Sequence, residues 1–116
     1  MANGKDLRSI ALSLEGTTEA PHFDRAAFKV ARIYATLAAD GRTTNLKLSP
    51  EEQEFRCMLA PEAFAPVPGA WGKQGWTMAT LSALSAPSLR DALETAWRHA
   101  VRKKRAERRT KARTRR

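Results

Sequence analysis

Hydrophobic and polar residues alternate on both sides of Asp40-Gly41, and no other feature of the chain constrains its fold as strongly. Residues 32–37 alternate before this pair, and residues 45–48 alternate after it. A period of two places successive side chains on opposite faces of a β-strand. Asp-Gly favours a tight hairpin, because that turn needs a positive φ at both central positions. We therefore expect two antiparallel strands joined at Asp40-Gly41, with Phe28-Lys29-Val30 as a further strand before them.

A helix is expected on the N-terminal side of these strands, over residues 5–15. Four apolar residues from Leu7 to Leu14 recur at the spacing of one helical face. Asn3 or Asp6 can cap the start of this helix, and Gly16 suits the left-handed conformation that often follows a helix. The segment TTEAPH (17–22) is interpreted as a connector.

The segment SPEEQEF, which begins at Ser49, predicts the start of a second helix. Ser49 and Glu52 have the spacing of a capping box, and the proline between them suits the first helical position. Phe55, Met58 and Leu59 lie on one face of this helix and are predicted to be its buried stripe. The acidic residues of the first turn are interpreted as partners of the helix dipole rather than as a cation site.

The segment PVPGAWGKQGWTMATLSA (66–83) is interpreted as a short strand, a Gly-rich turn and a better strand from Trp76 to Leu81. A last helix is expected to begin near Pro87-Ser88. Its apolar stripe consists of Leu89, Leu93, Ala96, Trp97, Ala100 and Val101. No apolar stripe continues from Arg102 onward, so the edge of the folded domain is expected there.

The positive charge of the chain is confined to its C-terminal segment. The formal net charge is +9, yet residues 1–97 hold 10 Lys/Arg against 11 Asp/Glu. Residues 98–116 hold 11 Lys/Arg and the single acid Glu107. We therefore expect one domain over residues 1–103, followed at 104–116 by a basic tail that is disordered or a frayed helix. A polycationic segment binds nucleic acids through their phosphates without sequence preference.

The sequence contains no pattern that indicates catalysis or a cofactor. The single Cys57 excludes an intrachain disulfide, and its position between Phe55 and Met58 is typical of a packed thiol. The two histidines are far apart, so a metal site is not expected. An acid–base pair of His22 and Asp24 is kept as an alternative. With no apolar run of membrane-spanning length and no signal peptide, we expect a soluble cytoplasmic protein without cofactor, metal or membrane contact.

The motif around Trp71, Lys73 and Trp76 allows two interpretations. An exposed aromatic and a cation on a turn could stack on a base and pair with a phosphate. The tryptophans could instead anchor the strand to the core, as large aromatic side chains commonly do. We favour the core for Trp76 and leave Trp71 open between the two.

The order of these segments resembles that of the MmcQ/YjbR-like family over roughly residues 5–103. The stretches that carry the resemblance are LSLEGTTEAPHF, FKVARIYATL, NLKLSPEE, WGKQGWTMATL and LRDALETAWRHAV. The resemblance implies a secretion-chaperone-like or frataxin-like α+β fold, in which helices pack on one face of an antiparallel sheet. With the segments read above, the expected order is α-β-β-β-α-β-β-α, with the basic tail added.

The resemblance also implies DNA binding, because members of the family are described as DNA-binding proteins that use a "double wing" of hairpins. Lys29, Lys47 and Lys73 match positions where the family places basic residues. The segment before Trp76 is richer in Lys, His and Asn in the family, and the family pattern does not include the Arg-rich tail.

These observations predict a non-enzymatic protein that binds DNA largely through phosphate contacts of its tail, with possible contacts from hairpin wings. The nucleic-acid-binding residues that we predict are Lys29, Lys47, Lys73, Trp71, Arg102, Lys103, Lys104, Arg105, Arg108, Arg109, Lys111 and Arg113. The alternative is a protein- or small-ligand-binding domain that uses the face of its sheet, with the tail an incidental appendage. A cleft lined by Trp71, Trp76 and Tyr34 would favour this alternative.

Overall fold

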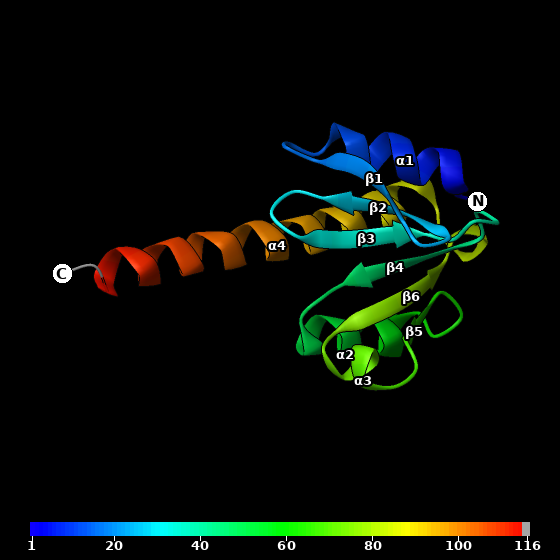
Figure 1. Cartoon of the computed structure of the whole chain (residues 1–116). Coiled ribbons are helices and arrows are strands. Elements are labelled where there is room, and N and C mark those ends of the chain that lie inside the picture. The colour runs from blue at the N-terminus through cyan, green and yellow to red at the C-terminus, as the bar shows by residue number, and fades with distance from the viewer. Residues whose placement is uncertain (115–116) are drawn as a thin grey trace.

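The chain folds into a six-stranded antiparallel sheet with helices on one face (Figure 1). The computed structural model describes the backbone of residues 1–114 and the side chains of residues 1–102. In chain order the elements are α1 (Gly4–Ser13), β1 (Thr18–His22), β2 (Arg25–Lys29), β3 (Ile33–Leu37), β4 (Thr43–Lys47), α2 (Pro50–Leu59), β5 (Phe64–Pro66), α3 (Ala70–Lys73), β6 (Trp76–Thr80), the short 3-10 helix η1 (Leu81–Ala83) and α4 (Ala86–Thr114). The strands lie in the order β1-β2-β3-β4-β6-β5. This architecture confirms the expected α+β class.

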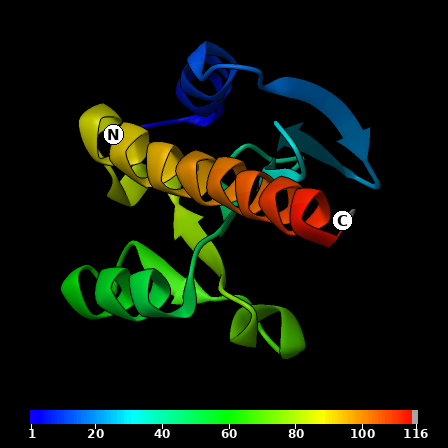
Figure 2. The same cartoon turned by 90° about the vertical axis from the view of Figure 1, so that its left-hand side faces the viewer.

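Helix α4 lies in the middle of the helical layer, between α1 and α2 (Figure 2). It packs on β3 and β4, the two central strands, and α1 packs beside it. Leu46 from the sheet and Leu89 and Leu93 from α4 are fully buried in the core between the two layers. The opposite face of the sheet is free of α1, α2 and α4.

The hairpin at Asp40-Gly41 joins β3 to β4 as expected, but its turn differs from the predicted one. Gly41 has a φ of 73°, whereas Asp40 does not adopt a positive φ. The Asp40 carboxylate instead accepts a hydrogen bond from the backbone N–H of Arg42 at 2.9 Å. The loop between β3 and β4 is therefore longer than a two-residue turn. Of Asp40 and Gly41, only Gly41 adopts the left-handed backbone conformation that favours glycine.

The segment interpreted as a connector contains a strand, which corrects the sequence interpretation. Residues Thr18–His22 form β1 and pair with β2 from Thr18↔Lys29 to His22↔Arg25. Pro21 lies within this strand, where a missing N–H would normally argue against strand pairing. Because β1 is the edge of the sheet, its outer side has no neighbouring strand, and the proline is tolerated.

Two of the three predicted helix starts are confirmed by their caps, the first as a full capping box and the second through Ser49. The Asn3 side chain accepts a hydrogen bond from the Asp6 N–H, and the Asp6 carboxylate accepts one from the Asn3 N–H, each at 3.0 Å. The Ser49 hydroxyl accepts a hydrogen bond from the Glu52 N–H at 3.1 Å. Each cap satisfies N–H groups that have no partner within the helix.

The predicted buried stripe of α2 is wrong. Phe55, Met58 and Leu59 are 51%, 73% and 70% exposed. The inward face of α2 instead carries Arg56 and the partly buried Cys57. The helix is therefore turned about its axis relative to the orientation that its hydrophobic pattern predicts.

The last helix begins at Ala86 and keeps the predicted stripe against the core. The Ser85 hydroxyl accepts a hydrogen bond from the Ser88 N–H. Trp97 is only partly buried, and its indole N–H donates to the Glu15 carbonyl at 2.9 Å. The backbone of α4 continues as a helix to Thr114. Within the part of the chain that the structure describes, none of the helices has an apolar stretch long enough to cross a bilayer.

Candidate nucleic-acid interface

One end of the sheet carries two of the predicted lysines. Strands β2 and β4 run in the same direction, because each is antiparallel to β3 between them. Lys29 and Lys47 are the last residues of these strands and therefore lie at the same end of the sheet. Lys29 is exposed, whereas the ammonium group of Lys47 donates to the Gln74 carbonyl.

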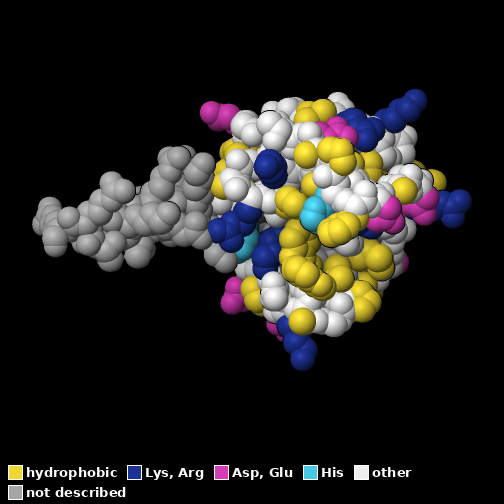
Figure 3. All heavy atoms as spheres, viewed as in Figure 1, with side chains coloured by type: hydrophobic (Ala, Val, Ile, Leu, Met, Phe, Trp, Pro, Cys, Tyr) yellow, Lys and Arg dark blue, Asp and Glu magenta, His cyan; other side chains and the backbone are white. Residues whose placement is uncertain are grey.

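The same end is where α4 leaves the sheet (Figure 1). Arg98, His99 and Arg102 of α4 line a shallow depression together with Ser49, which follows β4. Arg102 is exposed, and Arg98 pairs with Glu94 at 3.2 Å. On the strand face, Lys and Arg side chains gather next to the projecting helix (Figure 3). We call Lys29, Lys47, Lys73, Arg98 and Arg102 the basic end of the molecule.

The third predicted lysine and Trp71 lie on α3, a short helix held close to the sheet by two glycines. A Cβ atom on Gly72 would lie 2.0 Å from the carbonyl oxygen of Val67. A Cβ atom on Gly75 would lie 1.9 Å from the carbonyl oxygen of Leu48, and Gly75 also has a φ of +104°. Only glycine allows this close approach of two backbones at these positions.

Side-chain hydrogen bonds fix α3 further. The Gln53 amide of α2 donates to the Gly72 carbonyl at 2.9 Å and to the Trp76 carbonyl at 3.0 Å. Lys47 donates to the Gln74 carbonyl, which joins β4 to the end of α3. On this fixed segment Trp71 is 62% exposed, and Lys73 is exposed as well. The segment therefore presents an aromatic ring and a cation to solvent from a well-supported backbone.

Trp76 occupies a different position from the one expected. In β6, Thr77 and Ala79 face the core and are fully buried, so Trp76 and Met78 face the uncovered side of the sheet. Trp76 is half-buried there and lies opposite Lys47 on the neighbouring strand. Its interpretation as a core residue is wrong, and it lies beside the basic end instead.

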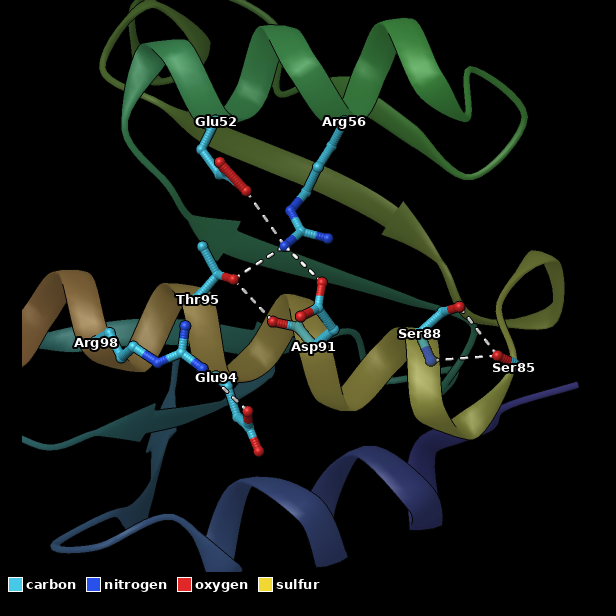
Figure 4. A network of polar contacts seen from close by, with 8 residues as sticks. All are labelled: Glu52, Arg56, Ser85, Ser88, Asp91, Glu94, Thr95 and Arg98. Carbon is cyan, nitrogen blue, oxygen red and sulfur yellow. Dashed lines mark hydrogen bonds and ion pairs between the residues drawn. The ribbon is translucent and has the colours of Figure 1, made fainter.

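A second cluster of polar side chains joins α2 to α4 (Figure 4). The Arg56 guanidinium donates to the Asp91 carboxylate at 3.0 Å and to the Thr95 hydroxyl at 2.9 Å, and it pairs with Glu52 at 3.4 Å. The guanidinium also lies over the Phe64 ring, 5.8 Å from its centroid. These contacts tie the two helices together, and we assign this cluster a structural role.

Two of the residues considered for catalysis, Cys57 and His22, have structural surroundings. Burial raises the pKa of the Cys57 thiol, which disfavours the thiolate that a nucleophile requires. His22 packs edge-on against Phe23, with their ring centroids 4.8 Å apart. Among the described residues, no group of three or more His, Cys, Asp or Glu side chains is arranged to hold a metal ion.

The structure thus places Lys29, Lys47 and Arg102 at one end. Lys47 is also bonded to the Gln74 carbonyl at the end of α3, the helix that carries Trp71 and Lys73. The structure adds Arg98 and Trp76, which the site prediction did not include. Gln53 was also missed, since nothing in the sequence indicates that its amide holds α3. The side chains of the remaining predicted residues lie outside the described part of the chain: Lys103, Lys104, Arg105, Arg108, Arg109, Lys111 and Arg113.

Comparisons with known proteins agree with this fold. The model of the YjbR family matches residues 12–99. The chain is similar to the crystal structure of the Deinococcus radiodurans protein DR2400, described by the domain name DUF419, with 28% identity and a TM-score of 0.71. That alignment covers 83% of this chain and 76% of DR2400. No curated protein matches the sequence significantly. Because the family match extends over most of the folded part of the chain, this protein belongs to the YjbR family.

Proposed function

We propose that this protein binds DNA without catalysing a reaction, and that the basic end and the basic C-terminal segment form one binding surface. The cytoplasmic location expected from the sequence is part of this proposal. No cofactor is required, because phosphate neutralisation and stacking need only side chains of the chain itself.

The observation that carries the proposal is the convergence of cations from separate elements at one end. Lys29 comes from β2, Lys47 from β4, and Arg102 from the helix that continues into the basic segment. Residues 1–97 are close to neutral overall, so this gathering does not follow from an excess of basic residues. Cations that lie together on one surface can contact successive phosphates of one nucleic acid.

The alternative of a ligand cleft on the sheet receives less support. Such a cleft required Tyr34 to join Trp71 and Trp76. Tyr34 is fully buried, and its hydroxyl lies 2.8 Å from the Thr17 hydroxyl and points toward α1. It therefore cannot line a site together with the exposed Trp71.

The proposal is tested with a chain that ends at Val101. This change removes ten Lys/Arg and one Glu, which takes the formal net charge from +9 to 0 and leaves the buried stripe of α4 in place. We expect the shortened chain to fold and to lose most of its affinity for duplex DNA at low salt, measured by fluorescence anisotropy. Residual binding should be weakened further by Lys29→Gln, since Lys29 is exposed at the basic end.

Two other outcomes are informative. If the full chain fails to bind DNA at low salt, the proposal is wrong. If the shortened chain binds as tightly as the full chain, the site lies on the folded domain alone, and the basic segment has no part in it. Circular dichroism of both chains shows whether the shortened protein keeps its secondary structure.

A further inference from the structure

We propose that the preferred ligand is single-stranded DNA, whose bases stack on Trp71 and spread across the uncovered face of the sheet beside Trp76. This inference rests on the proposed function and specifies the form of DNA. Duplex DNA would then bind only through its phosphates.

The first step concerns Trp71. A tryptophan that is 62% exposed gains little from burial in this chain, yet its backbone is held by close contacts and hydrogen bonds. Gly72 and Gly75 pack against the carbonyls of Val67 and Leu48, and the Gln53 amide donates to the Gly72 carbonyl. The fold thus presents an aromatic ring to solvent from a fixed backbone, which lowers the entropy cost of stacking a base on it.

The second step concerns the uncovered face of the sheet. The register places a cross-strand row of mostly small side chains in the middle of this face: Ala20, Ala27, Thr36, Asn45, Met78 and Ala65. Ala27 and Thr36 are buried within this row, and the Arg25 guanidinium donates to the Thr36 hydroxyl at 2.8 Å. At the basic end, Lys47 lies opposite Trp76 on β6, and Lys29 lies opposite Thr18 on β1 and Ile33 on β3. Figure 3 shows hydrophobic side chains across the middle of this face and cations at the margin next to α4. A face with a middle row of mostly small side chains, with cations at the margin next to α4 and the exposed Trp71 on the neighbouring α3, suits bases on the face and phosphates at that margin.

The third step distinguishes a single strand from a duplex. Every base has a π-face that can stack on an aromatic side chain, but in a duplex both faces are covered by neighbouring base pairs. Trp71 would have to open the stack to reach them, which costs a few kcal/mol per base. Lys47 and Lys73 can contact phosphates in single-stranded and in duplex DNA alike, because the phosphates are exposed in both.

The test compares three ligands for the full chain at one salt concentration: a mixed-sequence single strand, its duplex, and an abasic strand with the same number of phosphates. The abasic strand keeps the charge and removes the bases. We expect the intact strand to bind about tenfold more tightly than the abasic strand, the range expected for stacking on one aromatic residue. Trp71→Ala should abolish this difference and leave duplex affinity unchanged.

Two variants serve as controls. Phe23→Ala removes an aromatic side chain that is 94% exposed at the β1–β2 turn, the opposite end of the sheet, and should change none of the three affinities. Lys73→Gln should weaken all three to a similar extent. Thermal unfolding of Trp71→Ala shows whether the fold is intact, as expected for an exposed side chain.

The outcomes separate this inference from the proposed function. Equal binding of the intact and abasic strands by the parent chain would overturn the single-strand preference and leave DNA binding through phosphates in place. Equal loss of all three affinities in Trp71→Ala would also overturn it, since the residue would then act on the fold. A parent chain that binds none of the three ligands would overturn both proposals.

Discussion

Tyr34 is the single tyrosine of the chain, and its hydroxyl lies between the sheet and α1. Burial raises the pKa of this hydroxyl above its usual value near 10, and the hydrogen bond with Thr17 offsets part of that rise. The folded protein therefore favours the neutral phenol. In the unfolded chain the phenol loses its proton at about pH 10.

This shift predicts a loss of stability at high pH. The contribution of Tyr34 is fully present below pH 10 and is lost as the pH rises from the unfolded pKa toward the higher folded pKa. Tyr34→Phe should cost about 1 kcal/mol at neutral pH, because it removes the hydrogen bond to Thr17. Above pH 10 the free energies of unfolding of the variant and the parent, measured in urea, should converge.

The comparison with Tyr34→Phe isolates this effect from the lysines, which lose their charge in the same pH range. The absorbance of the phenolate at each pH provides an independent measurement, since no other tyrosine contributes. A constant difference in the free energy of unfolding from pH 8 to pH 11 would contradict the raised pKa.

At the scale of elements, α2 is where hydrophobic pattern and packing disagree. The helix has ten residues and lies beside β5 and α4 rather than over the centre of the sheet. Gln53 has to reach the carbonyls of Gly72 and Trp76, and Arg56 has to reach Asp91. These directional contacts set the rotation of the helix and leave Phe55, Met58 and Leu59 in solvent.

The orientation of α2 predicts that replacing its charged Arg56 destabilises the protein more than replacing its apolar Met58. Met58→Ala should change the free energy of unfolding by about 0.5 kcal/mol or less, because Met58 is 73% exposed. Arg56→Ala should cost about 2 kcal/mol, since it removes charged hydrogen bonds of a side chain that is only 11% exposed. Urea unfolding of both variants measures the order. A larger cost for Met58→Ala would show that the apolar stripe is buried after all.

At the scale of the whole molecule, basic residues lie at both ends of the sheet, and only one end is next to the projecting part of α4. Lys29 and Lys47 lie at the end from which α4 projects. Lys5 is exposed near the start of α1, and the neighbouring Gly4 lies close to Gly41 of the β3–β4 turn. Lys5 is thus a basic residue of the opposite end.

This arrangement predicts which lysines contribute to the salt dependence of duplex binding. If about six cations of the full chain contact phosphates, the logarithm of the binding constant should fall against the logarithm of salt concentration with a slope of about −5. Lys29→Gln should reduce the magnitude of that slope by about 1. Lys5→Gln, which removes the same charge from the other end, should leave the slope unchanged. Equal effects of the two variants would show that net charge, rather than the basic end, governs binding.

The sequence by itself determined the features that depend on neighbouring residues. The caps at Asn3 and Ser49, the hairpin near Gly41 and the stripe of α4 follow from local hydrogen bonds and from the spacing of apolar residues. The family resemblance added the packing of helices on one face. Caps, hairpins and apolar stripes can be predicted without knowing which segments pack on the other side of the core.

Only the tertiary structure decided the features that depend on distant partners. The strand Thr18–His22 forms because it pairs with the backbone of β2. The segment TTEAPH has no alternation of apolar and polar residues that would indicate a strand. Trp76 faces the uncovered side because the register of β6 against β4 fixes its direction. The basic end exists because antiparallel pairing returns β2 and β4 to one side, where α4 also leaves the sheet. Residues 29, 47 and 102 become neighbours through backbone pairing and helix packing, which act between segments far apart in the chain.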